Sequence, residues 1–276
     1  MSPSKKRWVA FPAIVVAAVV WDILFHVLAP KPHYLNPSPI LLDKTLFVPI
    51  VSASLFAAFA TIGLVFIRIQ ASMSGTALRK GLKLAVAFGG LWLIGTPEMS
   101  LLFGSPLWVE ICGGLADASS LVLLGVLLGR TYGTDSPSAP IFDRSELARI
   151  WPVALCWLLL RYLGYISLGI ESSYTAAPLG TLLWTAGSGI WIGVMSVLLR
   201  PAAPQRGAYW TFSLLVFGGN WAIYTFFAPI FVSGPSVPGI VVRILVDVIA
   251  VAIGSALFEW SGPSGGGRRS SLAARS

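Results

Sequence analysis

Eight apolar stretches, each about long enough to cross a lipid bilayer, occupy most of this 276-residue chain. A spanning helix needs about 20 predominantly apolar residues at a rise of about 1.5 Å each. The stretches are continuous, whereas a transmembrane barrel needs alternating segments of about ten residues. The sequence therefore predicts an all-α, polytopic transmembrane helix bundle. We expect its eight spans at Trp8–Leu28, Leu46–Arg68, Leu82–Phe103, Leu107–Leu128, Ile150–Ile170, Leu179–Leu199, Trp210–Phe231 and Gly239–Phe258.

The composition excludes a soluble globular domain. Hydrophobic residues make up 56% of the chain and charged residues 11%, whereas a soluble domain carries about 25% charged residues. The basic start, Lys5 to Arg7, precedes an apolar run that continues to Leu28 without a small-x-small cleavage pattern. We therefore expect a retained first helix and not a signal peptide.

The net charge of +8 reflects membrane orientation and not a nucleic-acid partner. Most of the 19 Lys and Arg residues fall at the chain termini or at every second connection between spans. Cytoplasmic segments of membrane proteins are enriched in Lys and Arg. Both termini are therefore predicted to be cytoplasmic. Membrane lipids are the expected surroundings, and no nucleic acid is expected to bind.

The second half of the chain echoes the first. The segment Phe88-Gly89-Gly90-Leu91-Trp92 recurs as Phe217-Gly218-Gly219-Asn220-Trp221, at an offset of 129 residues. Pro106 and Pro235 keep this offset, and so do Gly125 and Gly254. Asp117 matches Asp247 after a slip of one residue, and Asp22 aligns roughly with Arg161. Because each unit has four spans, the two copies are predicted to be parallel, with an axis along the membrane normal and an interface that is a typical binding site.

This repeat predicts the division of the chain. Residues 1–130 form the first four-span repeat and residues 148–260 the second, with a cytoplasmic linker at 131–147 and a flexible basic tail at 261–276. The proline-rich connection Ala29–Thr45 is expected to be an extended or turn-rich loop with His33 and Tyr34 exposed. The Gly-Gly pairs are interpreted as close-packing positions and not as hinges.

The first half resembles small bacterial four-span membrane proteins of unknown activity. The resemblance lies in Lys80-Gly81-Leu82-Lys83, in Phe88-Gly89-Gly90, in the proline-containing turn at Pro106 and in a glycine-punctuated fourth span. It covers roughly residues 8–130, with the second half a diverged copy. It implies a helical fold and a bacterial cytoplasmic membrane, and it implies no activity.

Ionisable groups at membrane depth are costly, so each one within a span is a functional candidate. Two pairs, Asp22 with His26 and Arg243 with Asp247, lie four residues apart and so share a helix face. These groups either line a cavity for a polar or anionic head group or form ion pairs, Arg243 with Asp247 and Arg161 with Asp22 or Asp117. The candidate ligand-binding residues are Asp22, His26, Glu98, Glu110, Asp117, Arg161, Arg243 and Asp247.

No metal site and no cofactor are predicted. Asp22 and His26 could supply two ligands, but a zinc or iron site needs three or four, and His33 is expected to lie in a loop. No Gly-x-Ser-x-Gly nucleophile motif lies within the predicted spans, and the chain lacks a phosphate-binding loop. The catalytic residues of any enzyme activity are therefore not identifiable.

Three functions remain open. The first is a membrane protein that binds or transports a small, amphipathic or anionic molecule through a polar cavity at mid-membrane. The second is an accessory subunit of a larger membrane complex, with a membrane-protein partner or a second copy of itself. The third is a membrane enzyme acting on a lipid or isoprenoid, with Asp22 and His26 or Glu98 and Glu110 as acid and base.

Overall fold

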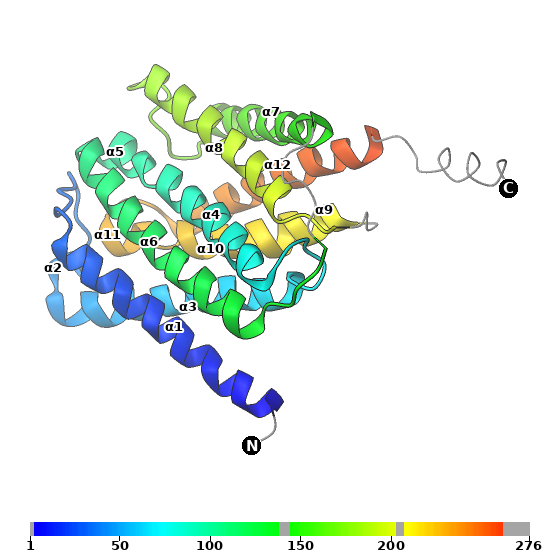
Figure 1. The fold of residues 1–276 in the computed structure, drawn as a ribbon. Helices are drawn as coiled ribbons and strands as arrows, with labels where there is room; N and C mark the ends of the chain where they lie inside the picture. Colours follow the sequence, from blue (N-terminus) through cyan, green and yellow to red (C-terminus); the bar gives the residue numbers. More distant parts are fainter. Residues whose placement is uncertain (1–2, 138–143, 203–206, 262–276) are drawn as a thin grey trace, which may run out of the picture.

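The computed structural model describes residues 3–137, 144–202 and 207–261, and these form an all-helical bundle (Figure 1). Eight segments are long and apolar enough to cross a membrane, as predicted. They are α1 (Pro3–Leu28), α3 (Lys44–Ile69), α4 and α5 (Ala77–Gly95, Pro97–Phe103), α6 (Leu107–Tyr132), α7 (Arg144–Ser167), α8 (Pro178–Leu198), the series α9, η1, α10 and α11 (Ala208–Trp210, Thr211–Gly218, Gly219–Thr225, Ala228–Phe231), and α12 (Val237–Ser261).

Two spans are broken where one continuous helix was expected. The third span breaks before Pro97, which begins α5, because proline has no N–H to continue the hydrogen-bond ladder. The seventh span contains a π-helical segment, η1, and breaks again at α11, where Pro229 lies in the first turn. The fifth span ends at Ser167, three residues earlier than predicted, and Gly169 follows in a left-handed conformation with φ of 63°.

The loop after α1 also differs from expectation. It contains a short helix, α2 (Pro39–Leu42), whose first turn is capped by the Ser38 hydroxyl. An isolated antiparallel bridge joins Pro37 to Val232, and Ser38 Oγ donates to the Ile230 carbonyl at 2.5 Å. The loop of the first half is therefore bound to the end of the seventh span.

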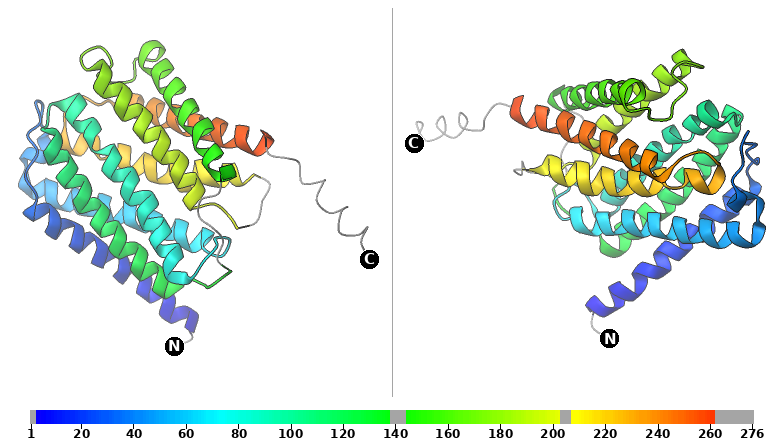
Figure 2. Two further views of the ribbon diagram at one scale, coloured as in Figure 1. Left: turned by 45° about the horizontal axis from the view of Figure 1, so that its top comes forward. Right: turned by 180° about the vertical axis from the view of Figure 1, so that it is seen from behind.

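The helices contact one another in a closed ring. The order of neighbours is α3, α1, α6, α4, α8, α7, α12, the η1–α10 pair, and then α3 again. Figures 1 and 2 show α1, α3, α4 and α6 on one side, and α7, α8 and α12 on the other. The two halves therefore meet twice, at α4 with α8 and at α3 with α10.

Small residues set the closest contacts between helices. A Cβ added to Gly81 of α4 would collide with the Gly125 carbonyl of α6, so the two backbones touch. A Cβ added to Gly90 would overlap the ring of Trp191 in α8, whose Nε1 donates to the Ala87 carbonyl at 3.0 Å. The close-packing interpretation of the Gly-Gly pair is confirmed at Gly90, and the contact joins the two halves.

The repeated motif also lies between the halves. Trp92 Nε1 in α4 donates to Asn220 Oδ1 in α10 at 3.0 Å, and both side chains are buried. Trp184 Nε1 in α8 donates to the Ile94 carbonyl of α4 at 2.8 Å. The indole hydrogen bonds give the interface directional contacts that apolar packing in a membrane lacks.

The predicted linker is partly helical, since α6 extends to Tyr132 and α7 begins at Arg144. Its residues 133–137 are bound to the α3–α4 connection: Asp135 accepts from Ala77 N, and Gln70 Oε1 accepts from Thr134. Residues 138–143 of the linker and 262–276 of the predicted tail lie outside the described residues.

Candidate functional site

A cavity of about 710 Å³ lies between the two halves. Its size is in the range of pockets that hold small organic molecules. It is lined by one end of α1, α3, α4, α6, α10 and α12 together with α5 and α11. The loop residues on its wall come from 30–34, 169–171 and 234–236, and we call this end of the bundle the cavity end.

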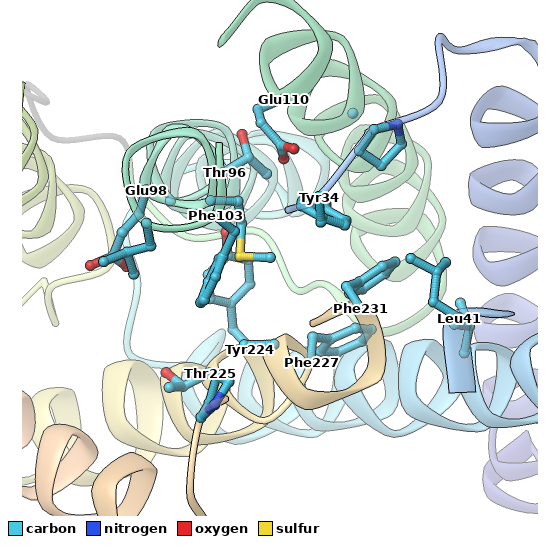
Figure 3. A pocket seen from close by; sticks show the side chains of 18 of the residues that line it. Tyr34, Leu41, Thr96, Glu98, Phe103, Glu110, Tyr224, Thr225, Phe227 and Phe231 are labelled. Carbon is cyan, nitrogen blue, oxygen red and sulfur yellow. The ribbon is translucent and has the colours of Figure 1, made fainter. Parts of the chain in front are cut away.

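Much of the cavity wall is apolar. Figure 3 shows Phe103, Phe227 and Phe231 around the cavity, with Tyr224 beside them and Glu98 and Glu110 toward α5 and α6. Phe227 and Phe231 belong to the last part of the broken seventh span. The part of the span that follows the π-helical segment, including the break at α11, therefore forms part of the wall.

One group of charges beside the cavity forms an ion-pair network. Arg161, fully buried on α7, donates from Nε and Nη2 to the two oxygens of Asp247 at 2.6 and 2.7 Å. Its Nη1 donates to Glu98 Oε1 and to Tyr165 Oη, each at 3.1 Å. The other Glu98 oxygen pairs with Arg243. We call Arg161, Asp247, Glu98 and Arg243 the arginine network.

Aromatic rings enclose this network. The Arg161 guanidinium carbon lies 4.7 Å from the Trp157 ring centre and 5.0 Å from that of Trp184. Such cation–π contacts strengthen when water is excluded. Trp221 Nε1 donates to Asp247 Oδ2 at 2.7 Å. The network joins α5 of the first half to α7 and α12 of the second, and Trp221 adds a contact from α10.

The predicted partners within this network were wrong. Both oxygens of Asp247 are bound by Arg161 and not by Arg243, and Arg243 pairs with Glu98. Arg161 binds Asp247 and Glu98 instead of Asp22 or Asp117. Sequence spacing identified residues on one helix face, but it could not identify which neighbouring helix that face meets. Glu98 pairs with both Arg161 and Arg243, so its two oxygens are already engaged. It is therefore a poor candidate for the acid or base of the predicted enzyme alternative.

A second group of charges lies across α1 and α6. His26 Nε2 is 2.9 Å from Asp117 Oδ1 and 3.7 Å from Asp22 Oδ2. Asp22 is fully buried, and neither of its oxygens has a hydrogen-bond partner among the residues that the structure describes. Lys31 is nearby, but its Nζ donates to the His26 carbonyl at 2.6 Å. We call Asp22, His26 and Asp117 the aspartate–histidine cluster.

Two further acidic or phenolic groups line the cavity near this cluster. Glu110 is buried seven residues before Asp117 on α6, so the two share a helix face, and its Oε1 has no hydrogen-bond partner in the described parts of the chain. Tyr34, expected to be exposed, is instead half-buried on the cavity wall, whereas His33 is exposed as predicted. Burial and the adjacent Glu110 carboxylate raise the pKa of Tyr34 above its usual value, so it is a neutral phenol at physiological pH.

Six of the eight predicted site residues line the cavity: Asp22, His26, Glu98, Glu110, Asp117 and Arg243. The remaining two, Arg161 and Asp247, lie behind them in the arginine network. Tyr34, Trp92 and Tyr224 are wall residues that sequence reasoning did not identify as part of a site. Trp92 was visible in the repeated motif, whereas nothing in the local sequence marks Tyr34 or Tyr224.

Searches against protein-family models, curated proteins and solved structures found no match to this chain. The function of the cavity must therefore follow from its own residues.

Carboxylates outnumber bases on the cavity wall. Five carboxylates line it, against Lys31, Arg243 and the imidazole of His26; the carboxylates are Asp22, Glu98, Glu110, Asp117 and Glu171. At the mouth, burial raises the pKa of Glu171 above its usual value, while Arg243 opposes that shift. An acidic wall of this kind attracts cationic or neutral polar groups and disfavours anions.

Proposed function

We propose that this integral membrane protein binds, and moves across the membrane, a small amphipathic molecule in the cavity between its halves. The observation that carries the proposal is the cavity itself: about 710 Å³, with a largely apolar wall and charged groups gathered on α1, α5, α6 and α12. An amphipathic ligand can place its apolar body against Phe103, Phe227 and Phe231 and its head group among the carboxylates. The charge balance of the wall favours a cationic or neutral head group over the anionic one considered from sequence.

The proposed setting is a bacterial cytoplasmic membrane with both termini inside. The clustering of Lys and Arg at alternate connections supports this orientation. The cavity end would then face the outside. It is lined by the C-terminal part of α1 and the N-terminal part of α12, which are the ends of these helices away from the chain termini. A ligand would enter between the loops at 30–34, 169–171 and 234–236.

We further propose that the two halves are a tandem duplication with parallel orientation. If α1, α3, α4 and α6 correspond to α7, α8, η1–α10 and α12, the order of neighbours is the same within each half. The third span of each half also contacts the second span of the other half, α4 with α8 and α10 with α3. This head-to-tail order supports a two-fold axis along the membrane normal, and the cavity lies at the interface.

A direct test measures the binding of two fluorescent amphiphiles of equal chain length, one with a trimethylammonium head and one with a sulfonate head. The protein is held in nanodiscs. We expect saturable binding of the cationic probe with one site per chain, and at least tenfold weaker binding of the anionic one.

Two tryptophan substitutions on the same helix supply the matched control. Val51 of α3 lines the cavity, whereas Leu64 of α3 is half exposed on the outer surface of the bundle. Val51→Trp should narrow the cavity and weaken binding of the cationic probe, and Leu64→Trp should leave it unchanged. Equal binding by both variants would place the probe in the lipid or on the outer surface and would refute the proposal.

Native mass spectrometry of protein extracted gently from its own membrane supplies the natural ligand. Retained small-molecule mass that Val51→Trp loses would support the proposal. Retained protein subunits, with no small molecule in either form, would instead support the accessory-subunit alternative.

A further inference from the structure

The aspartate–histidine cluster has the donor atoms of a cation site, and its two carboxylates share a single imidazole. We propose that Asp22, His26 and Asp117 bind a divalent first-row transition-metal ion of the Mn²⁺ to Zn²⁺ series. The ion is distinct from the amphipathic ligand of the proposed function, and the inference needs only these three side chains.

The geometry of the three side chains fits a metal ion. One ligand atom from each side chain lies within 4.8 Å of the other two. His26 Nε2 is 2.9 Å from an Asp117 oxygen and 3.7 Å from an Asp22 oxygen. Metal–ligand bonds of about 2.0–2.2 Å place neighbouring donor atoms about 3 to 3.5 Å apart. An ion between the three atoms therefore needs only small side-chain adjustments, and it keeps an open side toward the cavity.

The burial of Asp22 is the independent observation that calls for a cation. Its side chain has no exposed surface, neither oxygen has a hydrogen bond among the described residues, and His26 Nε2 lies 3.7 Å from Oδ2. A buried carboxylate without a partner is strongly unfavourable, and it is stabilised by an opposite charge or by a proton. When both are ionised, Asp22 and Asp117 carry two negative charges, which a divalent ion neutralises and a single imidazolium does not.

The second half shows what fills the corresponding position there. Under the proposed duplication, α7 and α12 correspond to α1 and α6, and Asp247 corresponds to Asp117. Asp247 binds the Arg161 guanidinium from α7. The aligned position on α1 is Asp22, which adds a negative charge where the second half supplies a positive one. In the first half, a cation from solution can supply the positive charge that the Arg161 side chain supplies in the second.

The ligand set selects the class of metal. One imidazole and two carboxylates suit Mn²⁺, Fe²⁺ and Zn²⁺, whereas Mg²⁺ and Ca²⁺ prefer oxygen ligands alone. Neither cysteine belongs to the cluster, so the site lacks the thiolates that favour Cu⁺. The sequence predicted no metal because the third ligand, Asp117, lies 91 residues from His26.

The experiment is titration of chelator-treated, full-length protein in mild detergent with Zn²⁺ and with Mn²⁺, followed by calorimetry and by metal analysis after dialysis. The two histidines of the chain supply the matched control. His26→Asn should weaken binding by at least about 100-fold, more than the loss of an outer-shell partner costs. His33→Asn should bind as wild type does, because His33 Nδ1 faces the Lys31 carbonyl in the exposed loop.

The results that would overturn the proposal are specific. They are no binding of one ion per chain by the wild type, equal affinity in His26→Asn, or a loss confined to His33→Asn. If His26→Asn does not fold, X-ray absorption of the wild-type zinc complex decides: one imidazole among oxygen ligands is expected, and a spectrum without imidazole refutes the site. Val51→Trp should keep its metal affinity, so failure of the metal site and failure of the amphiphile site are separate outcomes.

Discussion

The arginine network and the aspartate–histidine cluster lie beside the same cavity, yet they differ in how their charges are satisfied. In the network, the Arg161 guanidinium reaches both oxygens of Asp247 and one of Glu98. In the cluster, a single imidazole lies against two carboxylates, and Asp22 has no hydrogen-bond donor in the described residues. The difference is that the charges of the network are bound to one another across three helices, whereas the cluster leaves two carboxylates to one imidazole.

The energetic reason lies in the cost of burying charge. A buried ion pair roughly balances its own desolvation, but removal of one partner leaves an uncompensated charge. The arginine network should therefore be sensitive to truncation. The cluster already contains an uncompensated carboxylate, so neutralising that carboxylate should cost little or stabilise the fold.

The largest expected effect is that of Arg161→Met. Loss of the guanidinium leaves Asp247 and Glu98 facing each other within a buried region. We expect the free energy of unfolding to fall by about 3–5 kcal/mol, measured by equilibrium unfolding in mixed micelles of SDS and a mild detergent. Arg161→Lys should recover part of this loss, because an ammonium keeps the charge but not the bidentate geometry. An unchanged stability would show that the network does not hold the helices together.

Trp221→Phe should have the next largest effect. The substitution keeps an aromatic ring in the stack but removes the N–H that donates to Asp247 Oδ2 at 2.7 Å. A hydrogen bond to a charged group contributes about 1.5–3 kcal/mol. The matched control is Trp92→Phe at the equivalent motif position, which removes a bond to the neutral Asn220 amide and should cost about 0.5–1.5 kcal/mol. Equal losses would mean that Asp247 needs no donor beyond Arg161.

Asp22→Asn should act with the opposite sign. In metal-free protein the amide removes a buried charge, so the free energy of unfolding should stay equal to that of wild type or rise by up to about 2 kcal/mol. Added Zn²⁺ should then stabilise wild type by mass action and leave Asp22→Asn unchanged. Thermal unfolding with and without the ion measures both effects. A large loss of stability in metal-free Asp22→Asn would remove the contrast between the two groups.

The smallest effect is expected for Trp21→Phe. Trp21 Nε1 donates to Ser119 Oγ at 3.2 Å at the exposed edge of the α1–α6 contact. Loss of one exposed neutral hydrogen bond should cost no more than about 0.5 kcal/mol. The same unfolding assay measures this loss of stability. A loss as large as that of Trp221→Phe would show that the Trp21 hydrogen bond contributes as much as the one to Asp247 in the network.

Much of the architecture was readable from the chain alone. Continuous apolar runs predicted all eight spans, because lipid requires every spanning backbone group to bond within its own helix. Lys and Arg placement predicted an orientation, and glycine patterns predicted close packing, which the structure confirms at Gly90. The cost of intramembrane charge picked out Asp22, His26, Glu98, Glu110, Asp117 and Arg243, all of which line the cavity.

Tertiary structure decided which of these groups meet. Helical periodicity places Asp22 with His26, and Arg243 with Asp247, on common faces. It does not determine how deep the neighbouring helix lies or how that helix is rotated about its axis. The pairing of Arg161 with Asp247, the approach of Asp117 to His26, and the inward position of Tyr34 all depend on contacts between segments far apart in the chain. Those contacts follow from side-chain packing across the ring of eight spans, and they determine which charges pair with one another and which line the cavity.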